Sequence, residues 1–175
     1  ISGYISISIR LNDLHIHHSP FNVTVLPGAF SSTVSSASGA GLSRATAGEE
    51  TQFVIQSKDE GGNNKVNDDA HFDVSLSLVD SDDEVDVIGT TSFIGSGRYL
   101  VSYTAFVSGQ YNLVVSDENG ESINGSPFSV VSPNVMSGPF SIVDGDGLVS
   151  GVVGETNQVR VQGRDRYLNL VHYST

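Results

Sequence analysis

The sequence of 175 residues contains no cysteine, no tryptophan, one methionine and five prolines. Without cysteine the chain has no disulfides, no thiolate metal sites and no cysteine nucleophile. No apolar run reaches the length of about 18 residues needed to cross a bilayer, and the N-terminus lacks the pattern of a signal peptide. Long Leu, Ala, Glu and Lys stretches at helical spacing are also missing, which favours an all-β chain over a helical bundle.

Basic residues are few. Lys and Arg total 8 against 20 Asp and Glu, which gives a net charge of -12 at pH 7. A field of this sign repels phosphate backbones and anionic head groups, so we expect no nucleic-acid partner and no membrane insertion by this segment. The only lysines are Lys58 and Lys65, serine is abundant, and sequons begin at Asn22 and Asn124. These two candidate N-glycosylation sites lean towards an extracellular or cell-surface location.

One motif occurs twice with nearly the same internal spacing. Gly3-Tyr4 followed by Ser19-Pro20-Phe21 recurs as Gly109-Gln110-Tyr111 followed by Ser126-Pro127-Phe128. Tyr4 and Tyr111 stand 107 residues apart, and so do Pro20 and Pro127. The spacing predicts that Tyr4 and Tyr111 occupy the same place in two copies of one unit, with no gap between the copies.

A second pair of segments gives almost the same period. Gly39-Ala40-Gly41-Leu42 recurs as Gly145-Asp146-Gly147-Leu148, 106 residues later, and each is followed by Gly-Glu. A unit of this length suits one complete immunoglobulin-like sandwich. We therefore expect residues 1–26 to be the closing strands of one repeat, 27–132 a complete repeat, and 133–175 the opening strands of the next. Short joints are expected at Leu26-Pro27-Gly28 and Ser132-Pro133.

Apolar residues alternate with polar ones along several short segments of the complete repeat, as expected for half-buried strands. Turn residues such as those of 60–64, 95–97 and 118–120 separate these segments. The pattern predicts seven strands in the complete repeat. They are placed at 30–37, 53–55, 72–78, 85–87, 99–103, 111–115 and 123–130.

Two segments of this repeat resemble filamin repeats. Residues 97–104 follow the filamin pattern G-x-Y-x-V-x-Y-x, and residues 123–130 follow I-x-G-S-P-F-x-V. The opening 41–55 also resembles the G-L…G-E…F-x-V start of that family. The residues that carry the signature are Gly97, Tyr99, Val101, Tyr103, Gly109, Tyr111, Gly125, Ser126, Pro127 and Phe128. Departures are His17 and His18, where Pro and Gly usually stand, and an unusually acidic connection at 80–86.

The resemblance implies tandem immunoglobulin-like β-sandwich repeats that act as a non-enzymatic spacer or scaffold in a filament, fibre or cell-surface assembly. The implied partners are other protein chains, copies of this one among them. A cytoplasmic actin-crosslinking filamin and a sandwich module of a larger enzyme are alternatives. In filamins partners bind a groove beside the third and fourth strands, where a partner strand could be added. That groove would involve Ser75, Ser77, Val85 and Val87.

Two clusters could carry chemistry, and each has a simpler explanation. His15, His17 and His18 could contribute to a Zn²⁺ or Cu²⁺ site, and the acidic residues of 80–86 could bind Ca²⁺. No further ligand has a fixed place beside the histidines, and the acidic residues lack EF-hand spacing. Solvated surfaces are therefore the favoured interpretation. No G-x-S-x-G elbow or phosphate loop occurs, so neither an enzyme nor a cofactor is expected.

Overall fold

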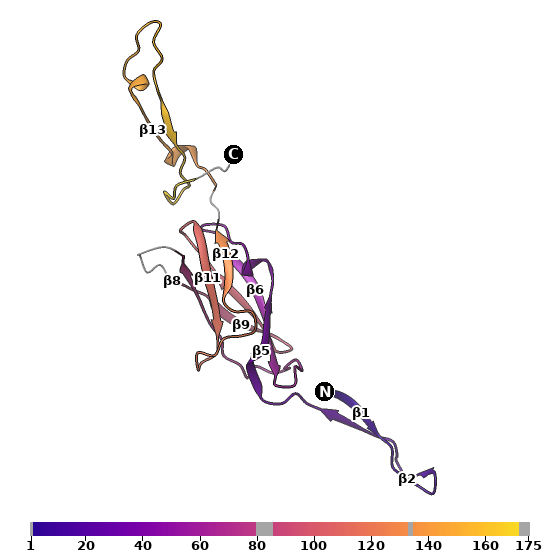
Figure 1. Ribbon diagram of the computed structural model, residues 1–175. Helices are drawn as coiled ribbons and strands as arrows, with labels where there is room; N and C mark the ends of the chain where they lie inside the picture. Colours follow the sequence, from indigo (N-terminus) through magenta and orange to yellow (C-terminus); the bar gives the residue numbers. More distant parts are fainter. Residues whose placement is uncertain (1, 80–85, 133–134, 172–175) are drawn as a thin grey trace.

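The chain is built from β-strands. The computed structural model describes residues 2–79, 86–132 and 135–171, which form strands and three one-turn 3₁₀ helices. Figure 1 shows three parts in a row: an N-terminal hairpin, a sandwich in the middle and a C-terminal strand pair. No helix within the described ranges is long and apolar enough to cross a membrane. The predicted all-β immunoglobulin-like class is confirmed.

The middle part consists of two four-stranded sheets packed face to face. One sheet has the order β5 (Phe30–Ser38), β6 (Thr51–Asp59), β10 (Arg98–Tyr103) and β9 (Thr90–Gly95). The other has the order β12 (Phe128–Ser132), β11 (Gly109–Ser116), β7 (Asp73–Leu78) and β8 (Asp86–Ile88). All pairings between neighbouring strands are antiparallel.

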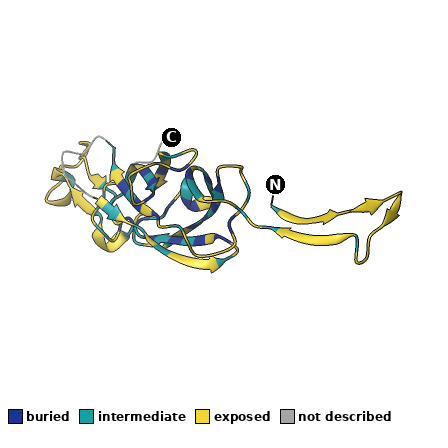
Figure 2. Cartoon of the chain, turned by 90° about the horizontal axis from the view of Figure 1, so that it is seen from below, coloured by how far each residue is buried: buried dark blue, intermediate teal, exposed yellow. Residues whose placement is uncertain are grey.

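The core lies between these sheets because every second residue of the inner strands points inwards. Ile55 and Val101 from one sheet and Leu76, Tyr111 and Leu113 from the other are fully buried. Burial is concentrated in this middle part, as Figure 2 shows, whereas the N-terminal hairpin is exposed along its length. The alternation seen in the sequence therefore identifies the inner face of the sandwich.

The strand count of seven is wrong, because the described residues between Phe30 and Ser132 already form eight strands. The additional strand is β9, which pairs with β10 at the sheet edge. Its apolar residues Phe93 and Ile94 are adjacent in sequence, so a search for alternation does not detect it. The prediction that Ile123 belongs to the last strand is also wrong. Ile123 is buried in a turn closed by the Ser126 N–H on its carbonyl, and β12 begins at Phe128.

The C-terminal part repeats the start of the sandwich. It comprises η2 (Gly138–Phe140), β13 (Ile142–Asp144), η3 (Asp146–Leu148) and β14 (Arg160–Gln162). Val143 pairs with Val161 in the register in which Ala37 pairs with Ile55, 106 residues earlier. The helix η3 likewise matches η1 (Ala40–Leu42). The sequence segments that recur after 106 residues therefore form the same local structure in both copies.

The N-terminal part repeats the end of the sandwich, with a shift that the sequence spacing did not reveal. Its strands are β1 (Gly3–Ile7), β2 (Arg10–Leu11), β3 (Leu14–His15) and β4 (Phe21–Val25). Gly3 pairs with Val25 as Gly109 pairs with Ser132, and Ile5 pairs with Val23 as Tyr111 pairs with Val130.

Ile5 therefore takes the place of Tyr111, and the predicted equivalence of Tyr4 with Tyr111 is wrong. Tyr4 is 87% exposed, whereas Tyr111 is completely buried. The cause is the loop after the strand, which is one residue shorter in the first copy. Arg10 pairs with His15, but Ser116 pairs with Ser122.

Candidate functional site: joints, sheet edge and signature positions

The first joint is tied to the sandwich by a carboxylate at the end of β6. Asp59 Oδ2 accepts a hydrogen bond of 2.7 Å from the Gly28 N–H, and Oδ1 accepts one of 2.8 Å from the Asn63 N–H. The Asn63 side-chain amide donates to both carboxylate oxygens. The Asn63 amide and the Gly28 N–H together lower the pKa of Asp59 to about 2. The carboxylate thus joins the linker to the turn that follows β6.

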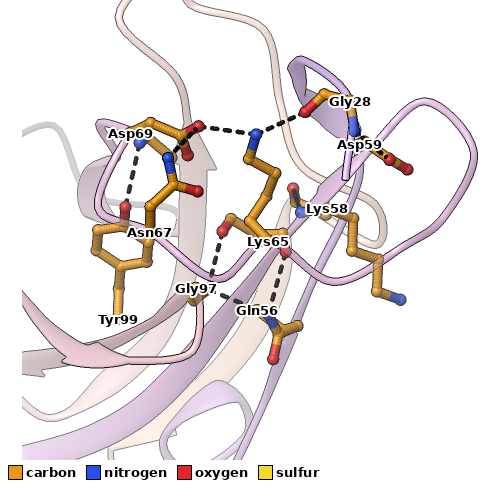
Figure 3. Close-up of polar contacts among 12 residues, drawn as sticks. Gly28, Gln56, Lys58, Asp59, Lys65, Asn67, Asp69, Gly97 and Tyr99 are labelled. Carbon is orange, nitrogen blue, oxygen red and sulfur yellow. Dashed lines mark hydrogen bonds and ion pairs between the residues drawn. The ribbon is translucent and has the colours of Figure 1, made fainter. Parts of the chain in front are cut away.

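Lys65 holds the same glycine from its other side. Its side chain is 6% exposed, and Nζ donates a hydrogen bond of 2.6 Å to the Gly28 carbonyl and lies 2.7 Å from Asp69 Oδ2. Figure 3 shows the ammonium group between Gly28 and Asp69. A buried ammonium is tolerated only when it is paired and hydrogen-bonded, and both conditions are met here. Nothing in the sequence around Lys65 distinguishes it from a solvated lysine, so this role was missed.

The signature glycine at 97 is explained by the same region. Gly97 has a φ of 65°, and its carbonyl accepts hydrogen bonds from the Ser57 hydroxyl and the Gln56 side chain. A Cβ at position 97 would overlap the Lys65 carbonyl, so only glycine fits this approach. Figure 3 shows Gly97 beside Lys65 and Gln56. The glycine at position 97 therefore allows the close packing of its own turn against the loop that contains Lys65.

The second joint carries a turn of the same construction. Asp165 Oδ1 accepts hydrogen bonds of 2.8 Å from the Tyr167 N–H and the Asn169 N–H, and Oδ2 accepts one of 2.7 Å from the Asn169 side chain. From this turn Asn169 Nδ2 reaches back to the Phe106 carbonyl at 2.9 Å. The Tyr167 ring meets the Phe106 ring edge-to-face at 5.5 Å between centroids. The turn therefore contacts the sandwich that precedes it.

The predicted strand-addition residues lie at the β7–β8 edge. Ser75 pairs with Ile88 and Ser77 with Asp86, whereas Val87 pairs with Leu76 and packs against the core. The two serines therefore share the outer face of the sheet with Ile88, which is 70% exposed. The edge strand is β8. Val85 lies outside the described residues, so its place in the proposed groove stays a prediction.

The two sequon asparagines are both exposed. Asn22 lies in β4, and its match in the complete repeat, Ser129, is exposed on β12. Asn124 donates its backbone N–H to the Ser35 carbonyl, and the Ser126 hydroxyl accepts the Val115 N–H at 3.0 Å. The serine of the second sequon is thus engaged with the backbone. Among the described residues the Thr24 hydroxyl of the first sequon makes no such bond, which favours Asn22 as the acceptor.

The histidines make local contacts. His15 Nδ1 lies 2.9 Å from the Ser19 hydroxyl, and its Nε2 accepts a hydrogen bond from Arg10 Nε. His18 has a φ of 65°, close to the 87° of Gly125, the glycine it replaces. In the described part of the chain no three His, Asp or Glu side chains are placed to share a metal ion. Of the acidic connection only Asp86 is described, and the question of calcium there stays open.

The signature tyrosines bury their rings and keep their hydroxyl groups paired. Tyr99 accepts the Ala70 N–H, Tyr103 donates to the Gly41 carbonyl, and Tyr111 donates to the Val107 carbonyl. The pattern that defines the filamin/ABP280 repeat matches residues 29–129. This chain belongs to the filamin repeat family. Two further signature residues belong to the same core: Val101 lies in it and Phe128 packs against it.

Solved structures of several other proteins share this filamin-like fold. The Escherichia coli adhesin FdeC aligns over 97% of this chain and 52% of its own, with 23% identity and a TM-score of 0.67. The Lin-41 filamin domain aligns over 60% of this chain and 97% of its own, at 20% identity and a TM-score of 0.51.

Invasin, a bacterial integrin-binding protein, aligns over 98% of this chain and 34% of its own, at 11% identity and a TM-score of 0.58. The chain thus spans about half of the FdeC structure and a third of the invasin structure. No curated protein sequence matches this chain.

Proposed function

We propose that this chain is a non-catalytic run of sandwich repeats that sets spacing within a filament, fibre or cell-surface assembly. In this proposal residues 1–26 close one repeat, 27–132 form a complete repeat, and 133–175 open the next. The observation that supports this proposal is a turn of the same construction that occurs twice, once around Asp59 and once around Asp165, in the first part of two successive repeats. Each turn holds itself by a carboxylate and contacts the preceding part of the chain through Asn63 or Asn169.

Such a turn suits a spacer because it forms hydrogen bonds across the joint, between the repeat that it belongs to and the preceding part of the chain. A joint that is hydrogen-bonded on both sides restricts the angles between modules more than a flexible linker does. At the first joint, Asp59 and Lys65 also fix both backbone groups of Gly28. The freedom left to that joint lies in Leu26 and Pro27, and proline narrows it further.

The spacing role is tested by backbone amide relaxation on the chain of 175 residues. We expect residues of the sandwich and of 135–171 to share one anisotropic tumbling time, as parts of a single elongated body. Separate tumbling times for the two parts, as for freely jointed beads, would remove the support for a spacer.

Protein partners are proposed to add a strand at the β8 edge, one strand away from Ser75 and Ser77 of β7. An edge strand exposes unpaired backbone groups, and a strand-forming segment can pair with them. A charged substitution on this face, Ser77→Lys, should weaken binding of a partner found with the native protein and leave the fold intact. Unchanged binding would move the partner site elsewhere.

An extracellular location is proposed from the two sequons and the scarcity of lysine. FdeC is an adhesin and invasin binds integrins, and both display this fold. Intact-mass analysis of native material tests the location. We expect glycan mass that is lost in Asn22→Gln and kept in Asn112→Gln, a control outside any sequon. An unmodified native chain would contradict the extracellular proposal.

A further inference from the structure

The two turns differ at one position that faces the joint. Their backbones match bond for bond: Gly62 N–H donates to the Asp59 carbonyl as Leu168 N–H donates to the Asp165 carbonyl. Downstream, the Lys65 N–H donates to the Ser57 carbonyl as the Val171 N–H donates to the Gly163 carbonyl. These bonds align position 61 with position 167. The first turn has glycine there and the second has tyrosine.

Tyr167 occupies a place that only a glycine in the preceding sandwich leaves free. Gly48 has a φ of 76°, and a Cβ on it would overlap the Tyr167 hydroxyl and ring. The Gly48 N–H donates a hydrogen bond of 2.7 Å to the Ala105 carbonyl, which brings that glycine beside Phe106. The ring therefore docks on two segments that are themselves joined, with its hydroxyl 3.4 Å from the Gly48 carbonyl.

The first turn has no side chain with which to make this contact. Because Gly61 has no side chain, it cannot pack against the part of the chain that precedes the first joint. Across this joint Asn63 Oδ1 accepts a hydrogen bond of 2.9 Å from the Ser2 N–H. Among the described residues no pair of aromatic rings crosses it, whereas the Phe106–Tyr167 pair crosses the second joint.

We propose that Tyr167 restrains the second joint by docking on Gly48 and Phe106, whereas Gly61 gives the first joint no such contact and leaves it the more pliant of the two. The inference rests on the proposed spacer function and deepens it. The aromatic contact adds packing and a preferred edge-to-face geometry to the hydrogen bond of the turn, with Tyr167 half-buried and Phe106 56% exposed. The residue at this single position would then set how stiff each joint of the chain is.

The test measures distances between spin labels across each joint. Because the chain has no cysteine, two introduced cysteines give a single labelled pair. Exposed Ser92 and Ser150 report on the second joint, and exposed Ser8 and Ser92 report on the first. We expect one narrow distance peak across the second joint and a broader distribution across the first. Tyr167→Ala should remove the narrow peak, and Tyr167→Phe should keep it because the ring contact remains.

Tyr4→Ala is the matched control, since it removes a tyrosine that is 87% exposed and outside the second joint. It should leave the Ser92–Ser150 distribution unchanged. Circular dichroism of Tyr167→Ala should match the parent, because the buried core of the sandwich does not include Tyr167. A distribution that stays narrow in Tyr167→Ala overturns this role of Tyr167 and leaves the spacer proposal standing. Broad distributions across both joints in the parent chain overturn both.

Discussion

A buried serine hydroxyl holds together the largest irregularity of the sandwich. The strand β5 bulges against β6: Ser31 pairs with Lys58, but the next pair is Ser36 with Gln56. Ser35 lies inside the bulge and is completely buried. Its hydroxyl donates a hydrogen bond of 2.7 Å to the Ser31 carbonyl and accepts one of 2.9 Å from the Lys58 N–H. It therefore replaces the ladder bonds that the bulge interrupts.

Ser35→Ala removes both bonds and leaves two backbone groups without these partners. A buried group that loses its partner costs about 1–3 kcal/mol, and Ser31 is half-buried, so some of its loss is recovered through water. We expect the free energy of unfolding to fall by about 2 to 3 kcal/mol, a large part of the roughly 5–15 kcal/mol of a typical domain. For a domain of this size the melting temperature should fall on the order of 10 to 20 °C.

The loss is measured by urea unfolding followed by circular dichroism. Ser36→Ala is the matched control, since Ser36 is the next residue, is half-buried, and its hydroxyl makes no hydrogen bond to a described residue. We expect it to change stability by less than about 0.5 kcal/mol, as surface substitutions usually do. If Ser35→Ala were as stable as Ser36→Ala, the hydroxyl would not be what secures the bulge.

Two further predictions concern pH. The Asp59 pKa of about 2 lies below its unfolded value of about 3.9, so the carboxylate stabilises the fold above about pH 4, and this contribution is lost as the pH falls through 2. Asp59→Asn should flatten the acid slope of stability in urea titrations, and an unchanged slope would contradict the assignment. Burial raises the pKa of Tyr103 to about 12, so its contribution is present below about pH 10 and is lost as the pH rises through 12. In an ultraviolet titration of tyrosine ionisation, Tyr103→Phe should remove one of the ionisations that occur above about pH 10. If the variant kept as many of these ionisations as the parent, the claim would be refuted.

The fold could be predicted because its core follows simple alternation. Leu76, Val101 and Tyr111 are fully buried, and each lies in a segment where apolar residues occupy every second position. The period near 106 residues also correctly located the matching strands of the C-terminal part, as the registers of β5–β6 and β13–β14 show. These features depend on local spacing, which a single sequence displays directly.

The features that were missed depend on contacts between distant residues. The strand β9 forms because β10 offers an edge, not because Phe93 and Ile94 alternate. Tyr4 was misplaced because it stands one position before the true match of Tyr111, and a following loop that is one residue shorter keeps the spacing to Ser19 equal. The role of Lys65 requires Gly28, 37 positions away, to lie beside it. No local pattern records such a neighbour.

Positions that are the same in both turns and those that differ have distinct physical roles. Asp59 and Asn63 recur as Asp165 and Asn169 because their side chains satisfy the N–H groups of their own turn. Position 61 lies in the same turn, and a Cβ there would meet the side chains of Asn63 at 3.0 Å and Asp59 at 3.3 Å, which would have to shift by a few tenths of an ångström. The second turn keeps the same backbone hydrogen bonds with tyrosine at the matching position 167, so the turn accepts a side chain there. Variation at this position can adjust the joint while the sandwich stays the same, which is how a chain of similar repeats can differ in stiffness from one joint to the next.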